Sequence, residues 1–246
     1  MGRVDDLEAL KYSSNYYQFL IAIKVGGGKY SYNKALKLNA DGFKTYRSMF
    51  NQFGLGVKTG IDLPFESVGY IGNDKNTGSL LDFPIGQYDT YTPFQILQYI
   101  NTVATSGERN SLHYLKSVKE GDKVVYEYNK RFLNKVNVSK KNMDRVRLGL
   151  EMVMKKGGTG HNYVDEKYKP SGKTGTSQSF IDSDLNGKID TETVTRTFGT
   201  YVNLNGKTIT IVVISPHISM ANSGSTYNAN KKISRDISDF YFKNYN

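Results

Sequence analysis

The stretch PSGKTGTSQ, residues 170–178, decides the fold. Its β-branched threonines alternate with small residues, which is typical of a strand that starts after a proline. Two further β-like runs follow at 194–203 and 207–215, and the turn sequence NLNG at 203–206 joins them. We therefore predict strands at 171–180, 194–203 and 207–215, of which the last two form an antiparallel hairpin.

Helical patterns lie on both sides of these strands. The spacing of apolar residues predicts helices at 4–11, 16–25, 41–53, 92–106, 139–156 and 228–245. A hairpin with strands at 113–119 and 123–128 is expected, and residues 54–86, rich in Gly, Pro and Asn, indicate an irregular surface excursion. Helices first and antiparallel strands later indicate an α+β fold, helical over about 1–160, with a sheet and final helix over about 170–246.

Some of these helices have clear signals at their ends or on their surface. Thr92 is expected to be an N-cap, with Pro93 at the first helical position. Asp41 is expected to cap the helix at 41–53, which ends at Gly54. The helix at 16–25 is apolar on nearly all sides and is therefore predicted to be buried.

The composition excludes several classes of function. The 246 residues have a net charge of +10, but the lysines are spread along the chain, so we expect no nucleic-acid partner. The sequence has no cysteine, which excludes thiol catalysis and cysteine-ligated zinc, and its three histidines lack metal-binding spacing. Because no apolar run is long enough to cross a membrane, we expect this chain to be soluble by itself.

Further motif-like segments precede the strand stretch. YSSNY at 12–16 places a Ser-x-Asn triplet, Ser13 to Asn15, at a break between two predicted helices. FGLGVKTGIDLP at 53–64 is followed by IGQYDTYTPFQ at 85–95. Each triplet alone is weak, because a second Lys-Thr-Gly occurs at 58–60 and a second Ser-x-Asn at 31–33.

In their order and spacing these segments resemble the transpeptidase domain of class B penicillin-binding proteins, from about Asp5 to the C-terminus. The resemblance implies the penicillin-binding protein or serine β-lactamase-like fold, an antiparallel sheet flanked by helices. It also implies peptidoglycan D,D-transpeptidase activity, which cross-links cell-wall stem peptides ending in D-Ala-D-Ala and is inhibited by β-lactams. The parent protein would be anchored at the extracytoplasmic face of the bacterial cell membrane.

The resemblance also assigns roles to individual residues. Ser13 would relay a proton to the leaving amine, and Asn15 would hold a substrate amide carbonyl. Lys173 would supply positive charge that attracts the terminal carboxylate of the substrate. Substrate would bind along the strand edge at Thr174, Gly175 and Thr176. Without the other motifs, Asn15 is better interpreted as a loop residue that caps the next helix. The alternative for 173–176 is an exposed strand start.

The family's first motif is not found in its usual place. The nucleophilic serine of the family lies in a Ser-x-x-Lys motif tens of residues before the Ser-x-Asn, but only twelve residues precede Ser13. The Ser-x-x-Lys at Ser31 to Lys34 follows the Ser-x-Asn on a polar segment and is interpreted as coincidence. We therefore expect a domain truncated at its N-terminal side and inactive alone, whose nucleophile comes from a preceding segment of the same protein. No cofactor is expected to be required.

Residues 182–190, DSDLNGKID, match the opening of a calcium-binding loop. The candidate ligands are Asp182, Asp184, Asn186 and Asp190. The twelfth position is Thr193 instead of the bidentate glutamate, so any Ca²⁺ binding is expected to be weak. The alternative is an acidic, turn-rich connection without a metal.

Two other functions fit the same residues. A β-lactam sensor or a β-lactamase shares the fold and the serine acyl-enzyme chemistry, although the TGIDLP segment at 59–64 is typical of the synthases. A non-enzymatic, calcium-dependent wall-binding module would use the acidic loop alone. Labelling with fluorescent penicillin and a calcium titration distinguish these possibilities.

Overall fold

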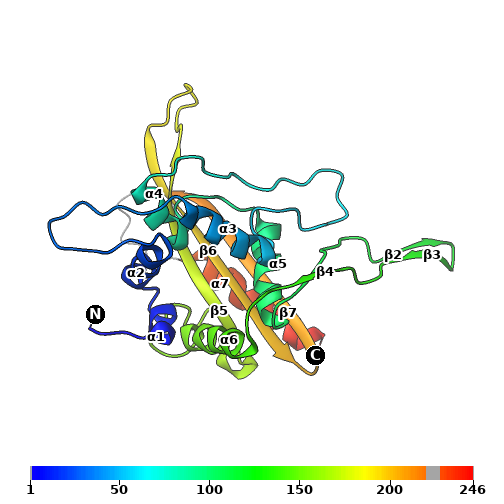
Figure 1. Ribbon diagram of the computed structural model, residues 1–246. Coiled ribbons are helices and arrows are strands. Elements are labelled where there is room, and N and C mark those ends of the chain that lie inside the picture. Colours follow the sequence, from blue (N-terminus) through cyan, green and yellow to red (C-terminus); the bar gives the residue numbers. More distant parts are fainter. Residues whose placement is uncertain (1, 220–227, 246) are drawn as a thin grey trace.

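A three-stranded sheet forms the centre of the molecule (Figure 1) in the computed structural model, which describes residues 2–219 and 228–245. Its strands are β5 (Ser171–Ile181), β6 (Thr191–Leu204) and β7 (Lys207–Ser219), antiparallel in the order β5-β6-β7. The predicted strands and the hairpin turn between the last two are confirmed. Each strand is longer than its residue pattern indicated, because pairing with its neighbour continues past the alternating segment.

Helices cover both faces of this sheet, so the predicted α+β class is confirmed. They are α1 (Asp6–Lys11), α2 (Asn15–Val25), α3 (Asp41–Phe53), α4 (Thr77–Asp82), α5 (Pro93–Ala104), α6 (Lys140–Met154) and α7 (Ala229–Asn244). Helix α5 packs on the face of β6 that includes Gly199 and Tyr201, whereas α7 packs on the opposite face, against Phe198 and Val202. A Cβ at Gly199 would lie 2.8 Å from Cγ1 of Ile100, so this glycine lets α5 lie close to the sheet.

The helix signals in the sequence were correct at some positions and wrong at others. Thr92 and Gln95 form a capping box around Pro93 at the start of α5, as predicted for the N-cap. Gly54, with φ of +100°, ends α3 as predicted. The predicted cap at Asp41 is wrong, because Asp41 lies inside the helix and its own N–H donates to Oδ1 of Asn39.

Helix α2 is not the buried helix that its composition predicted. Ala22 is its buried residue, whereas the side chains of Tyr16 and Leu20 are 71% and 42% exposed. Phe19 and Ile23 are half-buried. The apolar composition of α2 therefore exceeds what the rest of the described chain covers.

The excursion between α3 and α5 has more structure than the sequence indicated. It contains α4 and the 3-10 helix η1 (Phe83–Ile85), and its Leu80 and Phe83 form a small core with Phe43 of α3. A buried ion pair fixes the returning part of the excursion, because Arg47 of α3 donates to both carboxylate oxygens of Asp89, at 2.8 and 3.2 Å. Two fixed points therefore tie this segment to α3.

A hairpin of β2 (Ser117–Glu120) and β3 (Lys123–Glu127) projects from the body of the molecule (Figure 1). Its first strand begins later than predicted, because the N–H groups of Tyr114 and Leu115 donate to the carboxylate of Asp62. At its base, β1 (Glu108–Asn110) pairs with β4 (Phe132–Lys135), a ladder that the sequence did not reveal. No helix within residues 2–219 and 228–245 is long and apolar enough to span a membrane.

Candidate active site

The Ser-x-Asn triplet forms the turn between α1 and α2. Ser13 adopts a left-handed backbone conformation, with φ of +54°. The side chain of Ser14 accepts a hydrogen bond from the N–H of Tyr17 and so caps α2, and Asn15 is the first helical residue. The capping role considered for Asn15 therefore belongs to Ser14.

Contacts with α6 fix the position of this turn. Arg145 of α6 forms ion pairs with Asp5 and Asp6 at the start of α1. A Cβ at Gly149 of α6 would lie 2.5 Å from Cδ1 of Leu10, so glycine allows α1 and α6 to pack closely. Because α6 also packs against β5, the same helix positions both motif segments.

The side chain of Lys173 joins the two motif segments. Its Nζ donates to Oγ of Ser13 and to the carbonyl oxygen of Thr174, both at 2.7 Å. Burial lowers the pKa of Lys173 from its usual 10.5 to about 8. The structure thus places a lysine that gains and loses its proton near neutral pH beside the Ser13 hydroxyl.

A loop after α6 provides a second link between the segments, which sequence reasoning missed. The N–H of Thr159 donates to the carbonyl of Lys11, and its Oγ1 accepts from Oγ1 of Thr174 at 3.0 Å. The glycines around Thr159, at 157, 158 and 160, were the only local signal of an unusual turn.

One cavity of about 660 Å³ brings the predicted residues together. Its polar side contains all of the predicted catalytic and substrate-binding residues: Ser13, Asn15, Lys173, Thr174, Gly175 and Thr176. Its other side is apolar and comes from α3, α5 and α6, with Phe50, Phe53, Ile96, Tyr99, Val103, Met143 and Val146 among the lining residues. Gln87, from the IGQ segment, also lines the cavity.

The Ser-x-x-Lys at Ser31 to Lys34 lies elsewhere. It forms a turn after α2, in which the N–H of Lys34 donates to the carbonyl of Ser31. Lys34 is exposed, and neither residue lines the cavity. This position agrees with the interpretation of the motif as coincidence.

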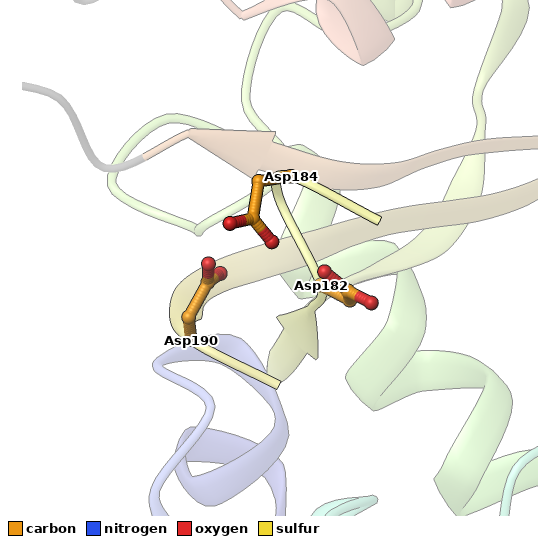
Figure 2. Close-up of side chains that lie close together, drawn as sticks. All are labelled: Asp182, Asp184 and Asp190. Carbon is orange, nitrogen blue, oxygen red and sulfur yellow. The ribbon is translucent and has the colours of Figure 1, made fainter. Parts of the chain in front are cut away.

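The acidic loop at 182–190 connects β5 to β6. The carboxylates of Asp184 and Asp190 face each other and Asp182 lies beside them (Figure 2), with one carboxylate oxygen of each within 4.8 Å of the others. The Asn186 side chain, the fourth predicted ligand, donates to Asp184. Hydrogen bonds from the Ser183 N–H, the Thr191 side chain and the Ser183 hydroxyl hold the pKa of Asp190 below its usual value.

The chain matches a family of known proteins over nearly its whole length. The family model of the penicillin-binding protein transpeptidase domain matches residues 2–239. This chain belongs to that transpeptidase family. Penicillin-binding protein 2A of Bacillus subtilis (strain 168) is 39% identical over 249 residues, which cover 99% of this chain and 35% of that protein.

Streptococcal transpeptidases of the family are also similar. Penicillin-binding protein 2B of Streptococcus pneumoniae (strain R6) is 30% identical over 251 residues, covering 96% of this chain and 35% of that protein. A solved structure of PBP-2B from strain R6 matches with a TM-score of 0.83 at 28% identity, covering 98% of this chain and 39% of that one. The chain thus spans about a third of the length of the curated relatives it matches.

Proposed function

We propose that this chain contributes the Ser-x-Asn and Lys-Thr-Gly sides of a peptidoglycan D,D-transpeptidase site, as the C-terminal part of a class B transpeptidase domain. The hydrogen bond between Lys173 and Ser13 is the observation on which the proposal rests, because it unites residues 160 positions apart in one cavity. The parent protein would work at the extracytoplasmic face of the cell membrane.

Each polar group of the cavity has a task in the proposed acyl transfer. The charge on Lys173 and the Thr176 hydroxyl attract the terminal carboxylate of a D-Ala-D-Ala stem peptide. The serine of the Ser-x-x-Lys motif gives its proton to the lysine of that motif and attacks the carbonyl of the penultimate D-Ala, whose oxyanion the Thr176 N–H stabilises. Ser13 passes a proton to the departing D-Ala amine, and Asn15 holds a substrate amide carbonyl. A second amine then displaces the serine from the ester.

The attacking serine in this proposal comes from a Ser-x-x-Lys helix of the same protein, outside these 246 residues. The apolar side of the cavity supports this, because Phe50, Ile96 and Met143 leave apolar surface for such a helix to cover in the cavity that also contains Lys173 and Ser13. The chain alone is then unable to form an acyl-enzyme.

Penicillin labelling tests this proposal. We expect no mass gain when the 246-residue chain is incubated with benzylpenicillin. We expect stoichiometric labelling when the chain is extended by its upstream Ser-x-x-Lys segment. An adduct on Ser31 in the short chain would contradict the proposal.

The extended protein also tests the role of Lys173. In it, Lys173→Ala should slow acylation by about 100-fold or more, the usual loss when one electrostatic stabiliser is removed. Lys44→Ala, at a side chain that is 84% exposed on α3, is the matched control and should leave the rate unchanged. An equal rate in Lys173→Ala would remove this residue from the site. Rapid release of the label with nitrocefin turnover would instead indicate a β-lactamase.

A further inference from the structure

Strand β5 lies at the edge of the sheet, and some of the backbone groups on its outer side are hydrogen-bonded whereas others are not. Strand β5 pairs with β6 on one side, and the N–H and C=O groups of alternate residues point away from β6. Two hydrogen bonds identify the outward-facing residues. The N–H of Gln178 donates to Oε1 of Gln87 at 3.2 Å, and the C=O of Thr174 accepts from Nζ of Lys173 at 2.7 Å. By alternation, Thr176 faces outward between them.

Between Thr174 and Gln178, Thr176 is therefore the available pairing position on this edge. Within residues 2–219 and 228–245, the N–H and C=O of Thr176 have no hydrogen-bond partner. It is exposed and lines the cavity. One N–H and one C=O of the same outward residue are what an added strand needs to form one pair of ladder bonds.

The position of Gln87 is fixed by the fold. The preceding 3-10 helix η1 is anchored by the buried Phe83 and ends at Gly86, whose φ of +81° turns the chain. The N–H of Gln87 then donates to the carbonyl of Asp82 at 3.1 Å. From this fixed turn the half-buried side chain of Gln87 extends to β5.

We propose that Gln87 is a specificity-determining residue, whose amide caps the β5 edge at Gln178 and limits a bound peptide to pairing with Thr176. The inference rests on the proposed function, in which Lys173 attracts the peptide carboxylate. A peptide with its C-terminus there and an antiparallel course runs past Thr176 toward Gln178. Because the Gln178 N–H is already bonded to Gln87, the chain before the terminal dipeptide cannot form a complete pair of ladder bonds there and turns away from the sheet. The site thus selects the terminal D-Ala-D-Ala and leaves the preceding residues outside the ladder.

Hydrogen exchange on the 246-residue chain tests the cap without any ligand. Gln87→Met removes the acceptor at similar side-chain length, and Gln87→Glu keeps an acceptor oxygen. Exchange of the Gln178 amide should be about tenfold faster in Gln87→Met than in wild type, and close to wild type in Gln87→Glu. Unchanged exchange in Gln87→Met, with the β6–β7 amides equally protected in all three proteins, would overturn the cap.

Amide chemical shifts during peptide titration test the limit on the ligand. The probes are N-acetyl-D-Ala-D-Ala and a stem pentapeptide that ends in D-Ala-D-Ala. In wild type, both should shift the Thr176 amide and leave Gln178 unchanged, whereas in Gln87→Met the pentapeptide should also shift Gln178. If the pentapeptide shifts the Gln178 amide in wild type, or does not shift it in Gln87→Met, then Gln87 does not limit peptide pairing to Thr176. If neither peptide shifts the Thr176 amide, the proposed function fails, and so does the proposed limit on peptide pairing. The exchange result then still decides whether Gln87 caps Gln178.

Discussion

The side chain of Lys173 makes stability depend on pH in a defined direction. Its pKa is about 8 in the folded chain because of burial and returns toward 10.5 on unfolding. Between these values the unfolded chain binds more protons, so this group makes the free energy of unfolding rise with pH. At lower pH Lys173 is protonated in both states, and the burial of its charge in the folded chain lowers the free energy of unfolding.

We therefore expect wild type to gain stability relative to Lys173→Met as the pH rises from about 7 to about 10. Urea unfolding of both proteins across this range measures the difference, in which the other titrating groups cancel. Lys44→Met, at an exposed position, should show a difference that is independent of pH. A constant difference for Lys173→Met as well would mean that its pKa is not lowered.

At this scale, sequence motifs predicted the residues that meet in the cavity but not those that hold them. The resemblance implied that Ser13 and Lys173 belong to one site, because their motifs follow the order of the family. Thr159 was missed, and Gln87 was given no role beyond its place in the IGQ segment, because each acts through a hydrogen bond whose partner is fixed by distant packing. A single hydroxyl or amide in a loop has no local pattern that indicates such a partner.

The β5–β6 hairpin is the element in which calcium binding is predicted. Three carboxylates within 4.8 Å repel one another, and a bound cation would relieve this repulsion. We expect millimolar Ca²⁺ to raise the melting temperature of wild type by a few degrees and to have no such effect on Asp184→Asn. Mg²⁺ serves as the matched control, because it prefers a smaller octahedral site. An equal response of wild type and Asp184→Asn would contradict the prediction.

Elements with strong local signals were predicted well, and those that depend on distant contacts were not. The capping box at Thr92 and the turn at 203–206 specify their structures locally. Helix α4 was missed because its six residues are too few for a periodic pattern, and Leu80 is buried by residues distant in the sequence, Phe43 of α3 among them. The pairing of β1 with β4 joins residues about 25 positions apart and likewise leaves no local trace.

The whole molecule combines a well-paired sheet with a helical part whose apolar surface is incompletely covered. Tyr16 and Leu20 of α2 are exposed, and the cavity, which these two residues do not line, is apolar on one side. Burying such side chains contributes about 1.5–3 kcal/mol each, against a total stability of about 5–15 kcal/mol for a domain. The chain should therefore be marginally stable or self-associate through this surface.

Hydrogen exchange with a measured oligomeric state checks this expectation. Amides of β5 to β7 should exchange slowly, and those of α2 at least tenfold faster in the monomer, because few buried contacts hold α2. Leu20→Ser should reduce self-association without altering exchange in the sheet. A monomer in which α2 exchanges as slowly as the strands would show that this helix needs no further cover.

The 160-residue separation between Ser13 and Lys173 has a consequence for the order of folding. The sheet consists of strands that follow one another in the chain, joined by the loop at 182–190 and the turn at 205–206, so its contacts are local and form early. The contact between Ser13 and Lys173 must instead close a loop that includes most of the chain, at an entropic cost that grows with loop length. On a ribosome, Ser13 emerges long before the strand it will meet. We therefore expect the cleft to be the last region to assemble and the first to open.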